Sequence, residues 1–290
     1  MPAAPTLVKE MIQDGMETLT RSERQLANIL LQDYPVAGLQ SITRLAQAAG
    51  VSTPTVIRMA RKLGFEGFPD LQERLREEVA EQIKKPISKR DAWQAKASDE
   101  HVLNTFARAV SSNLHHTLDR LNPAMFDEVA ALLADTARHV YLAGGRITRS
   151  NADYLFNHLQ IIRPNVTHLS HSANVWPQYL LDMDDRAILV VFDIRRYESD
   201  LLKLARLAAD RGSTIVLFTD QWGSPISKVT PFVFNALVEA PSNWDSTICI
   251  MMIVEALIAE VQTARWEDSK DRIEELESMF SATKLFRNFN

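Results

Sequence analysis

Four short apolar runs constrain the fold of the second half of the chain, because segments with helical periodicity follow or separate them. The runs cover residues 139–144, 186–192, 212–218 and 232–238. Strands that alternate with helices form parallel sheets, and a strand buried on both faces reads as a continuous apolar run. We therefore predict an α/β domain whose parallel sheet is flanked by helices.

The positions of the predicted helices locate the ligand-binding edge of this sheet. Helical periodicity covers residues 148–162, 199–211, 247–261 and 267–280, and two further amphipathic helices precede the sheet within 101–137. Ligands of parallel sheets bind beyond the carboxyl ends of the strands. We expect a site formed by the segments that follow the strands, which are residues 144–148, 193–197, 219–224 and 239–246.

Residues 41–65 have a different pattern, two short helices joined by a tight turn. Gly50 is suited to end the first helix because glycine adopts the left-handed conformation at little cost. Ser52 is expected to cap the second helix, with Pro54 in its first turn. Apolar residues at helical spacing give both helices a core face. This is the pattern of a helix-turn-helix motif, whose second helix enters the major groove of DNA.

The charge of this motif favours a polyanionic partner. No acidic residue lies between Asp33 and Glu66, and each phosphate neutralised by a basic side chain adds affinity through counterion release. We predict DNA contacts from Arg44, Ser52, Thr53, Thr55, Arg58, Arg61 and Lys62. The last five are expected on the outward face of the second helix, with Thr53 and Thr55 near base edges. A plain helical hairpin with a solvated basic face is the alternative.

Charge is distributed unevenly between the two halves of the 290-residue chain. Residues 1–90 hold 13 Lys and Arg against 11 Asp and Glu, whereas residues 91–290 hold 19 against 26. A basic head on an acidic body fits DNA binding confined to the N-terminal part. We predict an all-α helix-turn-helix domain over 1–83, a linker over 84–100 and the α/β domain over 101–290.

Cysteine content and hydropathy exclude several other classes of protein. The single cysteine, Cys249, lies in an apolar run and is expected to be a buried small side chain. No Cys/His cluster has the spacing of metal ligands, so we expect no metal site. We also expect no cofactor. No apolar run approaches the roughly 18 residues of a membrane span and no signal peptide is recognisable, so we expect a cytoplasmic protein.

Motifs in both halves resemble those of RpiR-type bacterial transcriptional regulators. The N-terminal matches are Leu19-Thr-Arg-Ser-Glu-Arg24, Ser41-Ile-Thr-Arg-Leu-Ala46, Gly50-Val-Ser52, Thr55-Val-Ile-Arg58 and Lys62-Leu-Gly-Phe65. The C-terminal matches are the order of elements, Thr219-Asp220, Ser224-Pro225 and Asp245-Ser246. The resemblance implies a helix-turn-helix domain joined to a sugar isomerase (SIS) domain that senses phosphosugars or related metabolites.

Two loops depart from the usual pattern of SIS domains. The usual Gly-x-Gly-x-Ser loop is here Gly144-Gly-Arg-Ile-Thr148, and Phe192-Asp-Ile-Arg-Arg-Tyr197 replaces a Ser-x-Ser-Gly-x-Thr phosphate loop. Small hydroxyl residues have thus given way to arginines, which bind carboxylate or phosphate as a bidentate fork. We predict an effector site of Arg146, Thr148, Asp193, Arg195, Arg196, Tyr197, Thr219 and Ser246, with Trp222 and Trp244 as further walls.

Alternatives remain open for the arginines and for the function. The arginines either line an anion pocket, pair with Asp193, Glu198 or Asp220, or bind a second subunit. The resemblance implies a non-enzymatic regulator of a sugar or carbohydrate-derivative catabolic operon. It would bind operator DNA as a homodimer or tetramer and respond to a small anionic metabolite, a phosphosugar or sugar acid. The alternatives are a phosphosugar isomerase-like enzyme with Glu239 or His171 as its base, and a regulator whose SIS domain is a ligand-free dimerisation scaffold.

Overall fold

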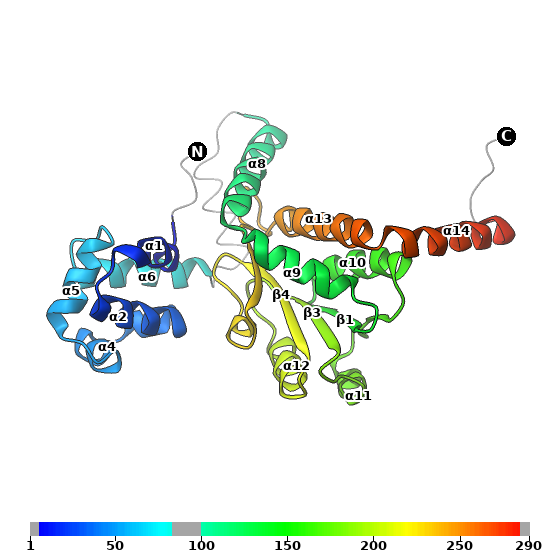
Figure 1. The fold of residues 1–290 in the computed structure, drawn as a ribbon. Helices are drawn as coiled ribbons and strands as arrows, with labels where there is room; N and C mark the ends of the chain where they lie inside the picture. The colour runs from blue at the N-terminus through cyan, green and yellow to red at the C-terminus, as the bar shows by residue number, and fades with distance from the viewer. Residues whose placement is uncertain (1–5, 83–99, 285–290) are drawn as a thin grey trace. The chain divides into compact units, whose positions relative to one another are not determined.

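The structure, a computed structural model, describes residues 6–82 and 100–284 (Figure 1). The chain divides into two compact units, residues 1–88 and 89–290. Apart from Glu100, the predicted linker over 84–100 lies outside the described residues.

The described part of the first unit is helical. Its elements are α1 (Val8–Gly15), a 3-10 turn (Met16–Thr18), α2 (Arg21–Gln32), α3 (Val36–Leu39), α4 (Ile42–Ala48), α5 (Thr53–Lys62) and α6 (Phe68–Gln82). Leu26, Leu45, Met59 and Leu75 form the centre of its core, one from each of α2, α4, α5 and α6. Helices α4 and α5 are the two helices expected within residues 41–65, which confirms the helix-turn-helix motif.

The turn between α4 and α5 requires its glycine. Gly50 has a φ of +63°, and the Val51 N–H donates to the Ala46 carbonyl at 2.9 Å, which closes the end of α4. A Cβ at position 50 would meet nothing within 4 Å. The constraint on this position is therefore the backbone conformation alone, as the sequence predicted.

The second unit contains a five-stranded parallel sheet in the order β2-β1-β3-β4-β5. The strands are β1 (His139–Gly144), β2 (Val166–His168), β3 (Ala187–Phe192), β4 (Thr214–Asp220) and β5 (Phe232–Ala236). Four of them are the predicted apolar runs, and β2 is an additional edge strand. The strand order reverses direction between β1 and β3, whose last residues Gly144 and Phe192 are register partners. Such a reversal is where open α/β sheets bind ligands.

Helices cover both faces of this sheet. The helices of this unit are α8 (Val102–Arg120), α9 (Pro123–Ala134), α10 (Arg149–Ile162), α11 (Trp176–Leu181), α12 (Ser199–Asp210), α13 (Ile248–Ala264) and α14 (Trp266–Thr283). Helices α9, α10 and α13 pack together on one face, and α11 and α12 lie on the other (Figure 1). This arrangement confirms the predicted fold class. Within residues 6–82 and 100–284, no helix has the length and apolarity needed to cross a membrane.

Candidate DNA-binding and effector sites

Helix α5, the second helix of the motif, exposes Arg58 and Arg61, and α4 exposes Arg44. Thr53, at the start of α5, is partly exposed. Thr55, in contrast, is only 5% exposed, so its expected place on the outward face is wrong. It lies one turn before Met59, and both belong to the side of α5 that packs on the core.

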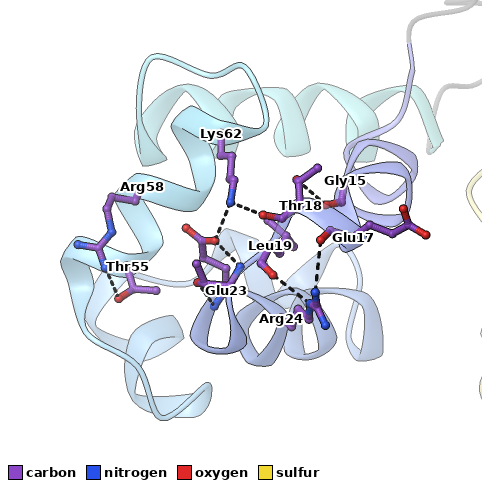
Figure 2. Close-up of polar contacts among 10 residues, drawn as sticks. Gly15, Glu17, Thr18, Leu19, Glu23, Arg24, Thr55, Arg58 and Lys62 are labelled. Carbon is purple, nitrogen blue, oxygen red and sulfur yellow. Dashed lines mark hydrogen bonds and ion pairs between the residues drawn. The ribbon is translucent and has the colours of Figure 1, made fainter.

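Hydrogen bonds join Thr55 to two of the other predicted DNA-binding residues. Ser52 occupies the expected N-cap position, but its hydroxyl accepts no hydrogen bond from a backbone N–H of α5. It is instead hydrogen-bonded to the Thr55 hydroxyl, with 2.9 Å between the two oxygens. Arg58 Nη2 donates to the same Thr55 oxygen at 3.0 Å (Figure 2). The first turns of α5 therefore hold a chain of three polar side chains that ends in an exposed guanidinium group.

Lys62 is directed towards α2 (Figure 2). Its Nζ lies 3.1 Å from Glu23 Oε2 and also donates to the Thr18 carbonyl. Burial raises the pKa of Glu23, but hydrogen bonds from Thr20 and Lys62 outweigh this effect and leave the pKa below its ordinary value. The ion pair fastens the C-terminal end of α5 to α2, which gives Lys62 a structural partner within its own unit.

In the second unit, Arg195 is neutralised by the protein itself. Its side chain is 4% exposed, with Nη2 at 3.3 Å from Glu239 Oε1 and Nε at 3.1 Å from Asp245 Oδ2. The guanidinium carbon lies 3.9 Å from the ring centroid of Trp222. Arg195 therefore forms ion pairs within the protein, which was one of the alternatives left open by the sequence. Its acidic partners, however, come from the segment after β5. Glu239, considered as the base of an isomerase, is committed to this pair.

Asp220, at the end of β4, organises the loop that follows β3. It is fully buried and accepts hydrogen bonds from the Arg195 N–H, the Tyr197 hydroxyl at 2.8 Å, and the Trp222 and Gly223 N–H groups at 3.0 and 3.2 Å. Burial raises its pKa, against the effect of these donors. Tyr197 is therefore a donor within the protein.

Asp193 and Thr219 belong to a second buried cluster beside it. Asp193 accepts hydrogen bonds from the Ser224 hydroxyl and from the Glu198 N–H at 3.2 Å. Burial raises the pKa of Asp193 to about 7. Thr219 Oγ1 accepts from the Ser224 N–H at 2.9 Å. Ser224 was not part of the predicted effector site, but it links Asp193 and Thr219, which were.

The reversal point between β1 and β3 is closed by Thr148. Its buried hydroxyl donates to the Phe192 carbonyl at 2.6 Å and accepts from the Gly145 N–H at 2.9 Å, which ties the loop after β1 to the end of β3. Ser246, after β5, is half-buried, and its Oγ accepts from the Ile248 N–H at 3.4 Å. Both hydroxyl groups have partners inside the protein.

The carboxylate of Glu198, from the segment after β3, contacts the backbone of the loop after β1. The Arg146 N–H donates to Glu198 Oε1 at 2.6 Å, and a Cβ added to Gly145 would lie 2.7 Å from the same oxygen. The side chains of Arg146 and Arg196 are exposed, and Arg196 has a φ of +62°. Glu198 had been considered only as an ion-pair partner for the arginines; its role as an acceptor for a backbone N–H has no signal in the sequence.

Two of the remaining candidate residues have simple environments. Trp222 is buried beneath Arg195, whereas Trp244 is 56% exposed. Among the residues of the two described ranges, no three His, Cys, Asp or Glu side chains are grouped to hold a metal ion.

Comparison with known proteins agrees with this division of the chain. A model described as "Helix-turn-helix domain, rpiR family" matches residues 6–82, and a model of the SIS domain matches residues 133–260. The chain thus has an rpiR-type helix-turn-helix domain followed by a SIS domain. The transcriptional regulator HexR of Pseudomonas aeruginosa is 26% identical over 95% of this chain and 96% of its own length, and HexR of Escherichia coli is 22% identical over 92% of each.

Solved structures share the fold of this chain. The sugar isomerase domain of an RpiR transcription factor from Sphaerobacter thermophilus superposes with a TM-score of 0.56 at 21% identity, over 61% of this chain and 97% of that one. NanR of Vibrio vulnificus, in complex with ManNAc-6P, gives a TM-score of 0.56 at 17% identity, over 97% and 99%. The chain is thus a transcriptional regulator of the RpiR and HexR type with a SIS domain.

Proposed function

We propose that this chain binds operator DNA through α4 and α5 and regulates a sugar or carbohydrate-derivative catabolic operon. It carries no enzymatic activity in this proposal. The supporting observation is the outward, acid-free face of the motif, on which Arg44, Arg58 and Arg61 are exposed. Basic side chains on that face neutralise phosphates, and the recognition helix reads base edges.

Binding to DNA is tested with a matched pair of exposed arginines. Arg61→Ala removes a charge from α5, whereas Arg76→Ala removes an exposed charge from α6 that pairs with Glu73 at 2.8 Å. We expect Arg61→Ala alone to weaken binding to duplex DNA and to lower the slope of log affinity against log salt concentration by about one. Equal affinities for wild type and both variants would contradict the proposal for this face.

We further propose that the SIS domain responds to a small anionic metabolite, a phosphosugar or a sugar acid, at the reversal point between β1 and β3. Support comes from the Arg146 N–H, which already carries the carboxylate of Glu198. A ligand carboxylate or phosphate can take the same hydrogen bond, and the loops after β1 and β3 each carry an exposed arginine, Arg146 and Arg196. NanR, which shares the fold, is described in complex with a sugar phosphate.

In this proposal the ligand competes with Glu198. We expect Glu198→Gln to bind hexose phosphates, pentose phosphates or sugar acids about tenfold more tightly than wild type, since the charge that repels an anion is removed. Asp200→Asn is the matched control, because Asp200 is exposed two residues later and pairs with Lys203. Calorimetry with these compounds measures the change. A ligand that binds Glu198→Gln no more tightly than wild type places the site elsewhere.

Operator recognition also leads us to propose a homodimer or tetramer. One helix-turn-helix unit reads few base pairs, and two units related by a two-fold axis read two half-sites. Light scattering of the full chain at micromolar concentration is the test, and a monomer both with and without DNA would refute this assembly.

A further inference from the structure

We propose that Arg58 reads a guanine in the major groove, and that the buried hydroxyl of Thr55 sets its guanidinium group for this contact. The inference rests on the proposed DNA-binding function and adds to it the base that is read and the residue that positions the reader.

One N–H group of the Arg58 guanidinium is hydrogen-bonded within the protein, and the other N–H groups remain for DNA. Nη2 donates to Thr55 Oγ1 at 3.0 Å, which uses one of the five N–H donors of the guanidinium group. The other donors lie on an exposed side chain (Figure 2). Guanine presents two adjacent acceptors in the major groove, O6 and N7, and arginine matches them with two parallel N–H groups.

Thr55 holds its hydroxyl in place independently of DNA. The residue is 5% exposed on the core side of α5, and its Oγ1 also exchanges a hydrogen bond with Ser52 Oγ at 2.9 Å. Packing therefore fixes the oxygen to which Arg58 is attached. An arginine held in one orientation loses less conformational freedom when it binds, so the hydroxyl favours a defined contact over a mobile charge.

Arg61 provides an internal comparison, because it lies one turn further towards the end of α5. Its Nε donates to the Glu66 carbonyl at 3.3 Å, in the turn after the helix. Base edges are contacted by the N-terminal part of a recognition helix, and Arg58 is nearer to that end of α5 than Arg61 is. Arg58 is thus assigned to base reading and Arg61 to phosphate.

The experiment begins with the full-length protein and a pool of random duplexes, from which bound sequences are selected. We expect wild type to enrich a site with an invariant guanine in each half. Arg58→Ala should lose the preference at that base pair alone, about ten- to a hundredfold. Arg61→Ala should keep the preference and lower affinity for all sequences.

A modified base tests the contact in the unaltered protein. Replacing the selected guanine by 7-deazaguanine removes N7, and we expect wild type to lose about tenfold in affinity while Arg58→Ala loses nothing more. Thr55→Val keeps the size of the side chain but lacks the hydroxyl, whereas Thr55→Ser keeps the hydroxyl. We expect Thr55→Val to lower the preference for guanine over the other bases, with an unchanged salt slope, and Thr55→Ser to restore it.

The outcomes separate this inference from the proposed function. If wild type enriches a site and Arg58→Ala enriches the same site with the same preference, or if 7-deazaguanine weakens both proteins equally, Arg58 is not the guanine reader although DNA binding stands. If Thr55→Val keeps the full preference, Thr55 is not the positioning residue. If wild type enriches no sequence, the proposed operator binding fails together with the inference.

Discussion

Replacing Arg195 by methionine should destabilise the second unit, because the change leaves two carboxylates without their cation. Removal of one partner from a buried ion pair costs about 3–5 kcal/mol. The side chains of Glu239 and Asp245 are 38% and 13% exposed, so water can solvate them in part. We therefore expect the lower end, about 3 kcal/mol. For a unit of this size the melting temperature should fall by roughly 6–12 °C.

Urea and thermal unfolding of the full chain, followed through tryptophan fluorescence, measure this effect. Trp222 lies against the Arg195 guanidinium group and reports on the site directly. Arg146→Met is the matched control, since Arg146 is exposed after the neighbouring strand and should change stability by less than about 0.5 kcal/mol. Adding Asp245→Asn to Arg195→Met should recover part of the loss, because it removes one of the two negative charges that Arg195 neutralises in wild type.

The reasoning would be refuted by an Arg195→Met protein that unfolds within about 1 kcal/mol of wild type but binds the anionic ligand more weakly. That result would return Arg195 to the effector site in which the sequence placed it.

Two further predictions follow from buried carboxylates. Lys62→Met should lower the melting temperature, at a cost of about 1–3 kcal/mol, because Glu23 loses a charged partner. The dependence of DNA affinity on salt concentration should stay unchanged. A fall of about one in the slope of log affinity against log salt concentration would instead make Lys62 a phosphate contact. For Asp193, burial raises the pKa from 3.8 to about 7, so wild type loses stability as pH rises between these values. The free energy of unfolding of Asp193→Asn, measured in urea, should therefore rise relative to that of wild type between pH 4 and pH 8. A difference between the two proteins that does not change with pH would contradict this cause.

The order of elements could be predicted because it follows from local patterns. Gly50 and the continuous apolar strands specify their own conformations, and the structure has both where the sequence placed them. Strand β2 was missed because it has three residues, Val166–His168, which is too short for a strand pattern. It forms because it pairs with β1.

The candidate sites were harder to predict, because the partner of a charged side chain is set by the tertiary fold. The acids that neutralise Arg195 come from a segment more than 40 residues later, so its sequence neighbours Asp193 and Glu198 gave the wrong pairing. Thr55 was misplaced for a local reason: it lies at the border of the apolar stripe of α5, where one position of helical phase decides burial. Spacing alone does not resolve such a border.

The close approach of Gly145 and Glu198 makes substitutions at these two positions interdependent. A methyl group at 145 would need the space of Glu198 Oε1, 2.7 Å from the added carbon, and a flexible side chain can turn away. Gly145→Ala would therefore move the Glu198 carboxylate away from the Arg146 N–H, where Glu198→Gln would remove its charge. The two substitutions should be epistatic, the second adding little after the first. In an evolving lineage, either position alone is enough to remove the internal carboxylate from this loop.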